Sequence, residues 1–173
     1  TDATMLAKIL PQIINWNEPS YIRLQRKNAE TVYDDSDIFD ITKAKLVKDG
    51  KDATIVASGI MVAKAVEASK ILAQQGLDIA VLNTFTWKPI DEDAIVLCAK
   101  KTKAVVVAEN HNRINGLFYA VADVLARKCP TVMESVAVQD MYGQVGKMPF
   151  LAEAYGLTTQ DIVNATLNAI KRK

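Results

Sequence analysis

The apolar pattern of residues 52–173 alternates between short β-branched runs and longer stretches with helical spacing, and this alternation repeats four times. Strands that alternate with helices in this way form a parallel sheet with helices on both faces. The expected strands cover residues 54–58, 79–82, 105–108 and 131–138, and the expected helices cover 61–75, 91–100, 115–127 and 159–171. We therefore predict a three-layer, doubly wound α/β fold.

A further strand precedes this alternation. Residues 44–47 and 53–56 flank the turn-forming sequence KDGKD, a pattern that is typical of a β-hairpin. The hairpin would add one antiparallel strand, which predicts a mixed sheet that is mostly parallel.

Residues 1–35 follow a different pattern. Their first part predicts a helix that is interrupted near Pro11, and residues 20–24 predict a strand. The polar, turn-rich residues 34–37 then separate this part from the α/β pattern. We interpret 1–35 as the end of a preceding domain plus a linker, and 36–173 as the α/β domain. Because the chain begins at Thr1 without a methionine, we expect it to be a piece of a longer protein.

The composition excludes several classes of function. Lys plus Arg (21) nearly balances Asp plus Glu (20), so no field of one sign attracts nucleic acid or an anionic membrane. The apolar runs are far shorter than the ~20 residues that span a bilayer, and TDATML is no signal peptide, so a cytoplasmic protein is expected. Cys98 and Cys129 lack CxxC spacing, and neither a disulfide nor a metal site is predicted.

The stretch 104–117, AVVVAENHNRINGL, places polar residues at the end of a buried strand, where parallel sheets bind ligands or partners. Glu109 and His111, the only histidine, have the spacing of an acid/base pair. The alternative is hydrogen bonding within a loop or a subunit interface, and this alternative is favoured because the sequence offers no second ligand and no G-x-S-x-G nucleophile. No catalytic residue is therefore assigned.

Other motifs are explained by folding alone. Gly59 lies between a strand and a helix, but SGIMVA lacks G-x-G-x-x-G, which favours a tight turn over a nucleotide site. In NTFTWKPID, Asp91 is a natural helix cap and Trp87 is a packing or interface residue. Thr158 and Asp161 predict a capping box at the start of the last helix.

Arg23 and Arg26 are candidates for binding an anion, since the guanidinium group matches a phosphate in shape and charge. On an extended strand a three-residue offset would place them on opposite faces, so at most one would face a given pocket. An exposed arginine beside Lys27 is also common on solvated surfaces, and the residues alone leave both alternatives open.

Taken together in their order, several segments resemble the carboxyl-terminal part of transketolase, especially the small subunit of split transketolases. These segments are PSYIRLQR, FDITKAKLVKDGKDATIVASGIMVAKAVEA, LNTFTWKPID, VVVAENH, VQDMYGQVGK and LAEAYGLTTQDIV. The resemblance implies a five-stranded mixed α/β domain at 36–173 and identifies 1–35 as the end of a pyrimidine-binding domain plus linker.

The resemblance also implies which residues have functional roles. In transketolases the arginine of an R-x-N stretch binds the substrate phosphate, and Arg26, followed by Lys27 and Asn28, matches it. The family's E-E-H and D-R-F-G segments correspond to residues 109–111 and 140–143. These place Glu109, His111 and Asp140 in loop or interface contacts.

The implied function is two-carbon ketol transfer between sugar phosphates, as part of a thiamine-diphosphate- and Mg-dependent transketolase, a transferase of the pentose phosphate pathway. The cofactor lies between other domains in this family, so we expect none to bind this chain alone, and we expect the chain alone to be inactive. The implied partner is a second copy in a homodimer, or the cofactor-binding part in a heteromer.

Two other enzymes share this terminal domain, a deoxyxylulose-phosphate synthase and the beta subunit of a 2-oxoacid dehydrogenase. A phosphate-binding Arg26 has no use in a simple oxoacid site, but it leaves the synthase open. A purely structural interaction module is the non-enzyme alternative, because an α/β layer with an unpaired helix and strand exposes surface that another domain would cover.

Overall fold

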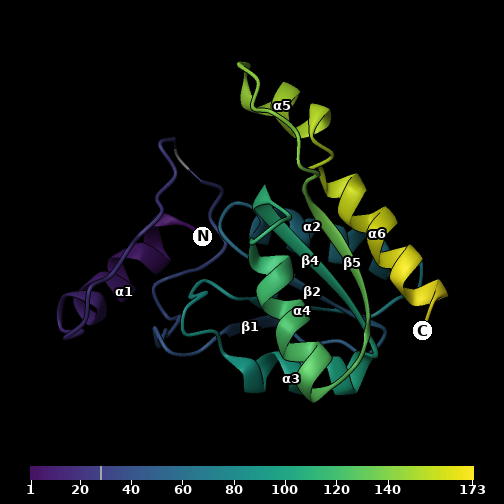
Figure 1. Cartoon of the computed structure of the whole chain (residues 1–173), viewed down its shortest axis with the longest axis horizontal. Helices are drawn as coiled ribbons and strands as arrows, with labels where there is room; N and C mark the ends of the chain where they lie inside the picture. Colours follow the sequence, from purple (N-terminus) through teal and green to yellow (C-terminus); the bar gives the residue numbers. More distant parts are fainter. Residues whose placement is uncertain (28) are drawn as a thin grey trace.

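The computed structural model of the chain describes residues 1–27 and 29–173. Its helices and strands follow the alternation expected from the sequence, with two additional helices outside it (Figure 1). In chain order they are α1 (Ala3–Ile14), β1 (Lys45–Lys48), β2 (Ala53–Ala57), α2 (Met61–Ala73), β3 (Ile79–Asn83), α3 (Glu92–Thr102), β4 (Ala104–Asn112), α4 (Leu117–Lys128), β5 (Val132–Val138), α5 (Met148–Ala154) and α6 (Thr159–Lys171).

The five strands form one sheet in the order β1-β3-β2-β4-β5. The pairs β2–β3, β2–β4 and β4–β5 are parallel, and β1–β3 is antiparallel, which confirms the predicted mixed sheet. The predicted hairpin is wrong in its pairing, because β1 pairs with β3 and not with β2. β2 already has a parallel neighbour on each side, so β1 can join only at an edge of the sheet, and it does so beside β3.

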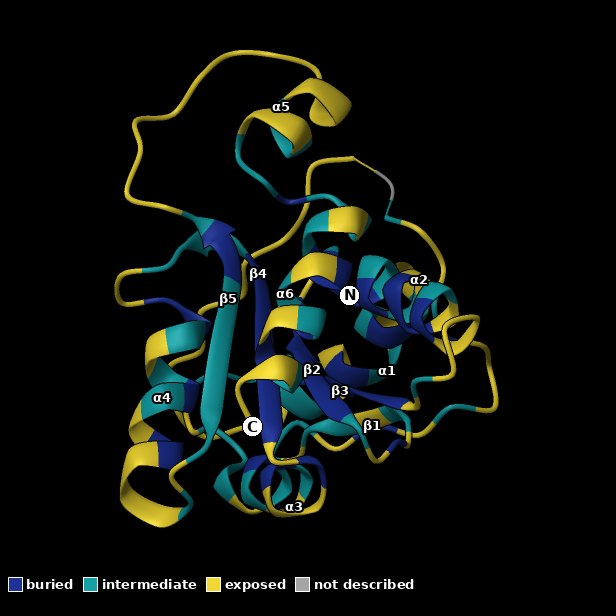
Figure 2. Ribbon diagram, turned by 90° about the vertical axis from the view of Figure 1, so that its right-hand side faces the viewer, coloured by how far each residue is buried: buried dark blue, intermediate teal, exposed yellow. Residues whose placement is uncertain are grey.

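Helices cover both faces of the sheet. One core lies between the sheet and helices α2 and α6, and a second core lies between the opposite face and helices α3 and α4. Figure 2 shows β2, β3 and β4 buried and the edge strand β5 only partly covered. Strands with apolar cores on both faces need continuous β-branched runs, and TIVA and VVVA provide them.

The N-terminal segment packs on the α/β domain through a third apolar cluster of Met5, Ile9, Tyr33 and Phe39. The predicted interruption of helix α1 at Pro11 is wrong, because the helix continues to Ile14 although proline offers no backbone donor there. The strand predicted at 20–24 is absent from the described residues, which form an exposed irregular segment with no neighbouring strand to pair with.

The carboxyl-terminal region contains one feature that the sequence predicted and one that it did not. The predicted capping box is confirmed, since Thr158 and Asp161 bond each other's backbone at the start of α6. Helix α5 was not predicted, and it has no buried residue. It projects from the body after the exposed segment 139–147 (Figure 2). Among the helices that the structure describes, none is long and apolar enough to cross a membrane.

Candidate functional site

Glu109 lies near the carboxyl end of β4, and its side chain is completely buried. Its carboxylate accepts hydrogen bonds from the backbone N–H of Leu117 at 2.7 Å and of Phe118 at 2.8 Å. These two donors open helix α4, where the N-cap Gly116 has no side chain to offer. Glu109 therefore acts as a remote cap that joins the strand end to the helix start.

Burial raises the pKa of the Glu109 carboxyl above its usual value, although the two backbone donors and the positive charges of His111 and Arg23 oppose this shift. Desolvation disfavours the ionised form, whereas the N–H donors and the helix dipole favour it. Burial and capping therefore act on the pKa of Glu109 in opposite directions. The contacts of its carboxylate hold the strand end to the helix, which is a structural role.

The loop between Glu109 and α4 requires close backbone approach. A Cβ atom at Gly116 would lie 2.2 Å from Glu109 Oε2 and 2.5 Å from the Asn112 carbonyl oxygen. Asn115 adopts φ 58°, a left-handed conformation that asparagine tolerates better than most residues. The tight form of the loop therefore depends on Asn115 and Gly116 together.

His111 lies beside this loop with its side chain 40% exposed. Its Nδ1 is 2.8 Å from the Asn112 carbonyl oxygen and 3.9 Å from Glu109 Oε2. Its ring meets that of Trp87 edge to face, with 5.8 Å between centroids. The histidine is thus held by loop contacts, and Trp87 is a packing partner for it.

Asp140, on the loop after β5, reaches the same region. Its Oδ1 accepts a hydrogen bond from Asn112 Nδ2 at 3.2 Å, and its own backbone is left-handed with φ 53°. The ends of β4 and β5 are therefore tied together at the carboxyl edge of the sheet. Asn112, which forms this link, was not recognised from the sequence because its partner lies 28 residues away.

The two candidate arginines have different surroundings. Arg23 donates from its guanidinium group to the carbonyl oxygen of Asn110 at 2.8 Å, so it contacts the same strand end. Arg26 lies at a bend three residues further on and is exposed. Asn28, the last residue of the R-x-N stretch, lies outside the described residues. The structure thus brings four of the candidate residues to one edge of the sheet, namely Arg23, Glu109, His111 and Asp140. Arg26 is close to Arg23 in the chain but is exposed to solvent.

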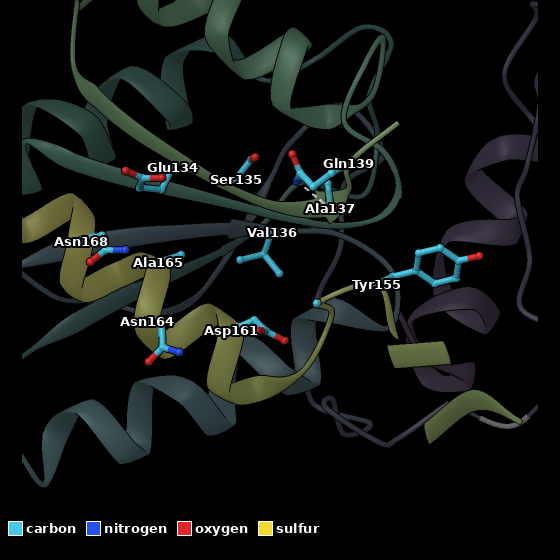
Figure 3. A pocket seen from close by; sticks show the side chains of 11 residues that line it. Glu134, Ser135, Val136, Ala137, Gln139, Tyr155, Asp161, Asn164, Ala165 and Asn168 are labelled. Atoms are coloured by element: carbon cyan, nitrogen blue, oxygen red, sulfur yellow. Dashed lines mark hydrogen bonds between the residues drawn. The ribbon is translucent and has the colours of Figure 1, made fainter. Parts of the chain in front are cut away.

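A shallow groove between β5 and α6 is a second concave region, and Figure 3 shows polar side chains along it. Three of those side chains have structural partners. Asp161 belongs to the capping box, Gln139 donates to the Ala137 carbonyl, and Glu134 pairs with Arg172. Within the described ranges 1–27 and 29–173, no three His, Cys, Asp or Glu side chains gather as a metal site.

The fold and this edge define a class, namely an open α/β domain with one antiparallel edge strand that presents polar loops at its carboxyl end. Residues 42–162, more than half of the chain, match the family model of the transketolase C-terminal domain. The chain therefore belongs to the transketolase family, as its sequence segments predicted.

Curated relatives and a solved structure agree with this family. The 6-deoxy-6-sulfo-D-fructose transketolase subunit of Clostridium sp. (strain MSTE9) is 44% identical over 172 residues, which cover 99% of this chain and 53% of that protein. A 1-deoxy-D-xylulose-5-phosphate synthase of Pelotomaculum thermopropionicum is 33% identical over 139 residues, 79% of this chain and 22% of that protein. The chain thus spans about half the length of the similar transketolase subunit.

The solved structure of a split gene transketolase, described as an inactive beta4 tetramer, superimposes with a TM-score of 0.95 at 39% identity. The match covers 99% of this chain and 56% of that one. This agreement extends over the N-terminal segment as well as the sheet domain. The chain therefore has the fold of the carboxyl-terminal part of split transketolases.

Proposed function

We propose that the protein provides the carboxyl-terminal part of a transketolase that transfers a two-carbon ketol unit between sugars and that works together with another subunit. The observation that carries this proposal is the match of 99% of the chain to a split transketolase, in both sequence and fold. Under this proposal residues 1–35 complete a pyrimidine-binding domain, and residues 36–173 form the terminal domain.

Thiamine diphosphate and Mg²⁺ are the cofactors of the proposed assembly. The cofactor supplies the carbanion stabilisation that ketol transfer needs. In the described part of the chain no three metal-ligating side chains gather, and the Gly59 turn lacks the G-x-G-x-x-G pattern. We propose that the rest of the assembly binds the cofactor and that this chain binds and orients the sugar.

Arg26 is the proposed substrate-binding residue. It is exposed on the segment that resembles the phosphate-binding R-x-N stretch, and its guanidinium group suits a terminal anion. The sugars in the names of two relatives carry such an anion, a sulfonate in one and a phosphate in the other. The proposed substrates are therefore sugars with a terminal phosphate or a group of similar charge.

Exposed apolar side chains support the proposal of a larger assembly. Tyr21 and Leu24 in the N-terminal segment, and Tyr142 and Val145 before α5, are largely open to solvent. Apolar surface of this kind is typical of regions that another chain or domain covers. The proposed partner is the cofactor-binding subunit, together with a second copy of this subunit.

Reconstitution tests the proposed function. The subunit, a cofactor-binding partner subunit, thiamine diphosphate and Mg²⁺ are expected to transfer a ketol unit from xylulose 5-phosphate to an aldose phosphate, and this chain without another polypeptide is expected to be inactive. Arg26→Ala should raise KM for phosphorylated sugars by about 10- to 100-fold, since a charge-assisted hydrogen bond contributes about 1.5–3 kcal/mol. Turnover by this chain alone, or an unchanged KM in the variant, would contradict the proposal.

The match to a 1-deoxy-D-xylulose-5-phosphate synthase makes that activity the second candidate. The same assembly would then form 1-deoxy-D-xylulose 5-phosphate, the sugar phosphate in that relative's name. Arg26 would serve either enzyme. The product decides between them, because only the synthase would form a 1-deoxy sugar phosphate.

A further inference from the structure

The segment of residues 17–27 carries Arg26, and it is attached to the sheet domain at a specific point. All of its residues are exposed, and the structure shows no helix or strand there. Among the hydrogen bonds of the described residues, one connects this segment to another element, the bond from the Arg23 guanidinium to the Asn110 carbonyl oxygen at 2.8 Å. The two residues are 87 positions apart in the chain.

The strand end that receives Arg23 is a rigid acceptor. Asn110 follows Glu109, whose buried carboxylate is bonded to the first two amides of α4. The charges of Arg23 and His111 also lower the pKa of Glu109, which means that they favour the ionised form of that carboxylate. Arg23 therefore contacts a fixed carbonyl and compensates a buried negative charge at the same place.

Arg26 lies three residues beyond this attachment, at a bend, and it is exposed. Three residues extend over at most ~11 Å, so the attachment of Arg23 limits the volume that the Arg26 backbone can sample. Without the attachment, the segment would be held only by α1 on one side and by the residues around Tyr33 on the other.

We propose that Arg23 is a positioning residue, which holds the segment of residues 17–27 on the end of β4 so that Arg26 is presented to the anionic end of the sugar. This inference rests on the proposed function, since it gives Arg23 a role only through Arg26. When the Arg26 guanidinium group is held in place before the sugar binds, binding does not carry the entropy cost of ordering the segment. The loop of Glu109 and His111 is, on this view, the support on which the substrate-binding segment rests.

A double-mutant cycle in the reconstituted assembly tests the proposal. Arg23→Ala should raise KM for a phosphorylated sugar about 3- to 10-fold with kcat nearly unchanged, and should leave KM for an unphosphorylated aldose unchanged. The Arg23→Ala/Arg26→Ala double variant should behave as Arg26→Ala alone, because a positioning residue has no effect once the positioned group is gone. Arg23→Lys, which keeps a charged donor, should recover part of the loss.

The outcomes separate this inference from the proposed function. If Arg26→Ala changes nothing, the proposed substrate-binding role fails, and the positioning role of Arg23 fails with it. If Arg26→Ala raises KM while Arg23→Ala does not, only the positioning role fails. If the effects of the two single variants multiply in the double variant, Arg23 acts independently of Arg26, which also overturns the proposal.

A second measurement does not depend on activity. Trypsin cuts after Arg and Lys, so the comparison uses the cut after Lys27 alone, a site that the unmodified protein and both variants share. The rate of this cut reports how freely the segment adapts to the protease. Arg23→Ala should accelerate this cut several-fold in the purified protein. The matched control is Arg172→Ala, which also removes an arginine that donates to a strand carbonyl, that of Met133 at 3.4 Å, but at the other end of the sheet. An equal rate in both variants would contradict a local attachment by Arg23.

Discussion

Gly116 and Glu109 are in such close contact that a Cβ atom on the glycine would lie 2.2 Å from Oε2 of the carboxylate. Gly116→Ala must therefore displace the carboxylate from the two amides that it caps. We expect a loss of about 3 kcal/mol in the free energy of unfolding, since overpacking costs about 1–3 kcal/mol and the displaced charged hydrogen bonds add to it.

Denaturant unfolding of the purified protein measures this loss. Gly143→Ala is the matched control, because nothing lies within 4 Å of a Cβ atom at that position. The control should unfold like the unmodified protein. Equal stability of the two variants would show that the Glu109 loop adapts to the added methyl group at no cost.

The buried Glu109 also predicts a pH dependence. Burial raises its pKa in the folded protein above the ordinary 4.5. As the pH rises through 4.5, the unfolded chain releases this proton first while the folded protein still holds it. The stability that Glu109 contributes is therefore complete at low pH and declines as the pH rises towards the folded pKa.

Glu109→Gln isolates this effect, since the amide does not titrate. The difference in the free energy of unfolding between the unmodified protein and the variant should decrease with pH from about 4.5 upward and then become constant. The variant should also be less stable at low pH. Its amide has one oxygen where the carboxyl has two, so one of the two backbone N–H groups would face an NH₂ group that cannot accept a hydrogen bond. A difference that grows with pH in this window would mean that capping, not burial, controls the carboxyl.

The sequence predicted those features that depend on neighbouring residues or on regular periodicity. The β-branched runs gave the parallel strands, and Thr158 with Asp161 gave the start of α6 because a capping box involves residues three apart. The pairing of β1 with β3 was not predictable in the same way. It depends on which strand edge remains free after the whole sheet has formed, whereas the Gly50 turn indicates only that the chain reverses.

In the candidate site, too, the residues could be predicted where neighbouring residues define them, and their contacts could not be predicted where these depend on the assembled fold. Glu109 and His111 were visible as polar residues at a strand end, but the two amides that Glu109 binds were not. The contact of Arg23 with Asn110 uses a backbone carbonyl, which every residue has, so no residue type could have indicated it. Helix α5 was missed because it is short and has no buried face to produce a periodic pattern.

The capping box gives a prediction of its own. Thr158→Ala removes the hydroxyl that accepts the Asp161 amide at 3.2 Å, and we expect a cost of about 1 kcal/mol in the free energy of unfolding. Thr159→Ala removes a hydroxyl one residue later whose partner is the exposed Glu67, so it should cost only a few tenths of that amount. Thermal unfolding of the two variants measures both losses of stability. A larger loss for Thr159→Ala than for Thr158→Ala would contradict the capping role.

Tyr33 links the N-terminal segment to the sheet, and its burial gives the last prediction. Its hydroxyl oxygen accepts a hydrogen bond from Asn83 Nδ2 at 2.8 Å, and burial raises its pKa to about 12. Tyr33→Phe should cost about 1 kcal/mol of stability at neutral pH. This contribution should be constant below pH 10 and should be lost as the pH rises towards 12, because ionisation of a buried phenol destabilises the folded protein. Ultraviolet titration of the folded protein should show one tyrosine that ionises only as the pH approaches 12, and the Tyr33→Phe variant should lack this late step. If the late step is absent from the unmodified protein, Tyr33 is not buried and the N-terminal segment does not pack on the sheet in solution.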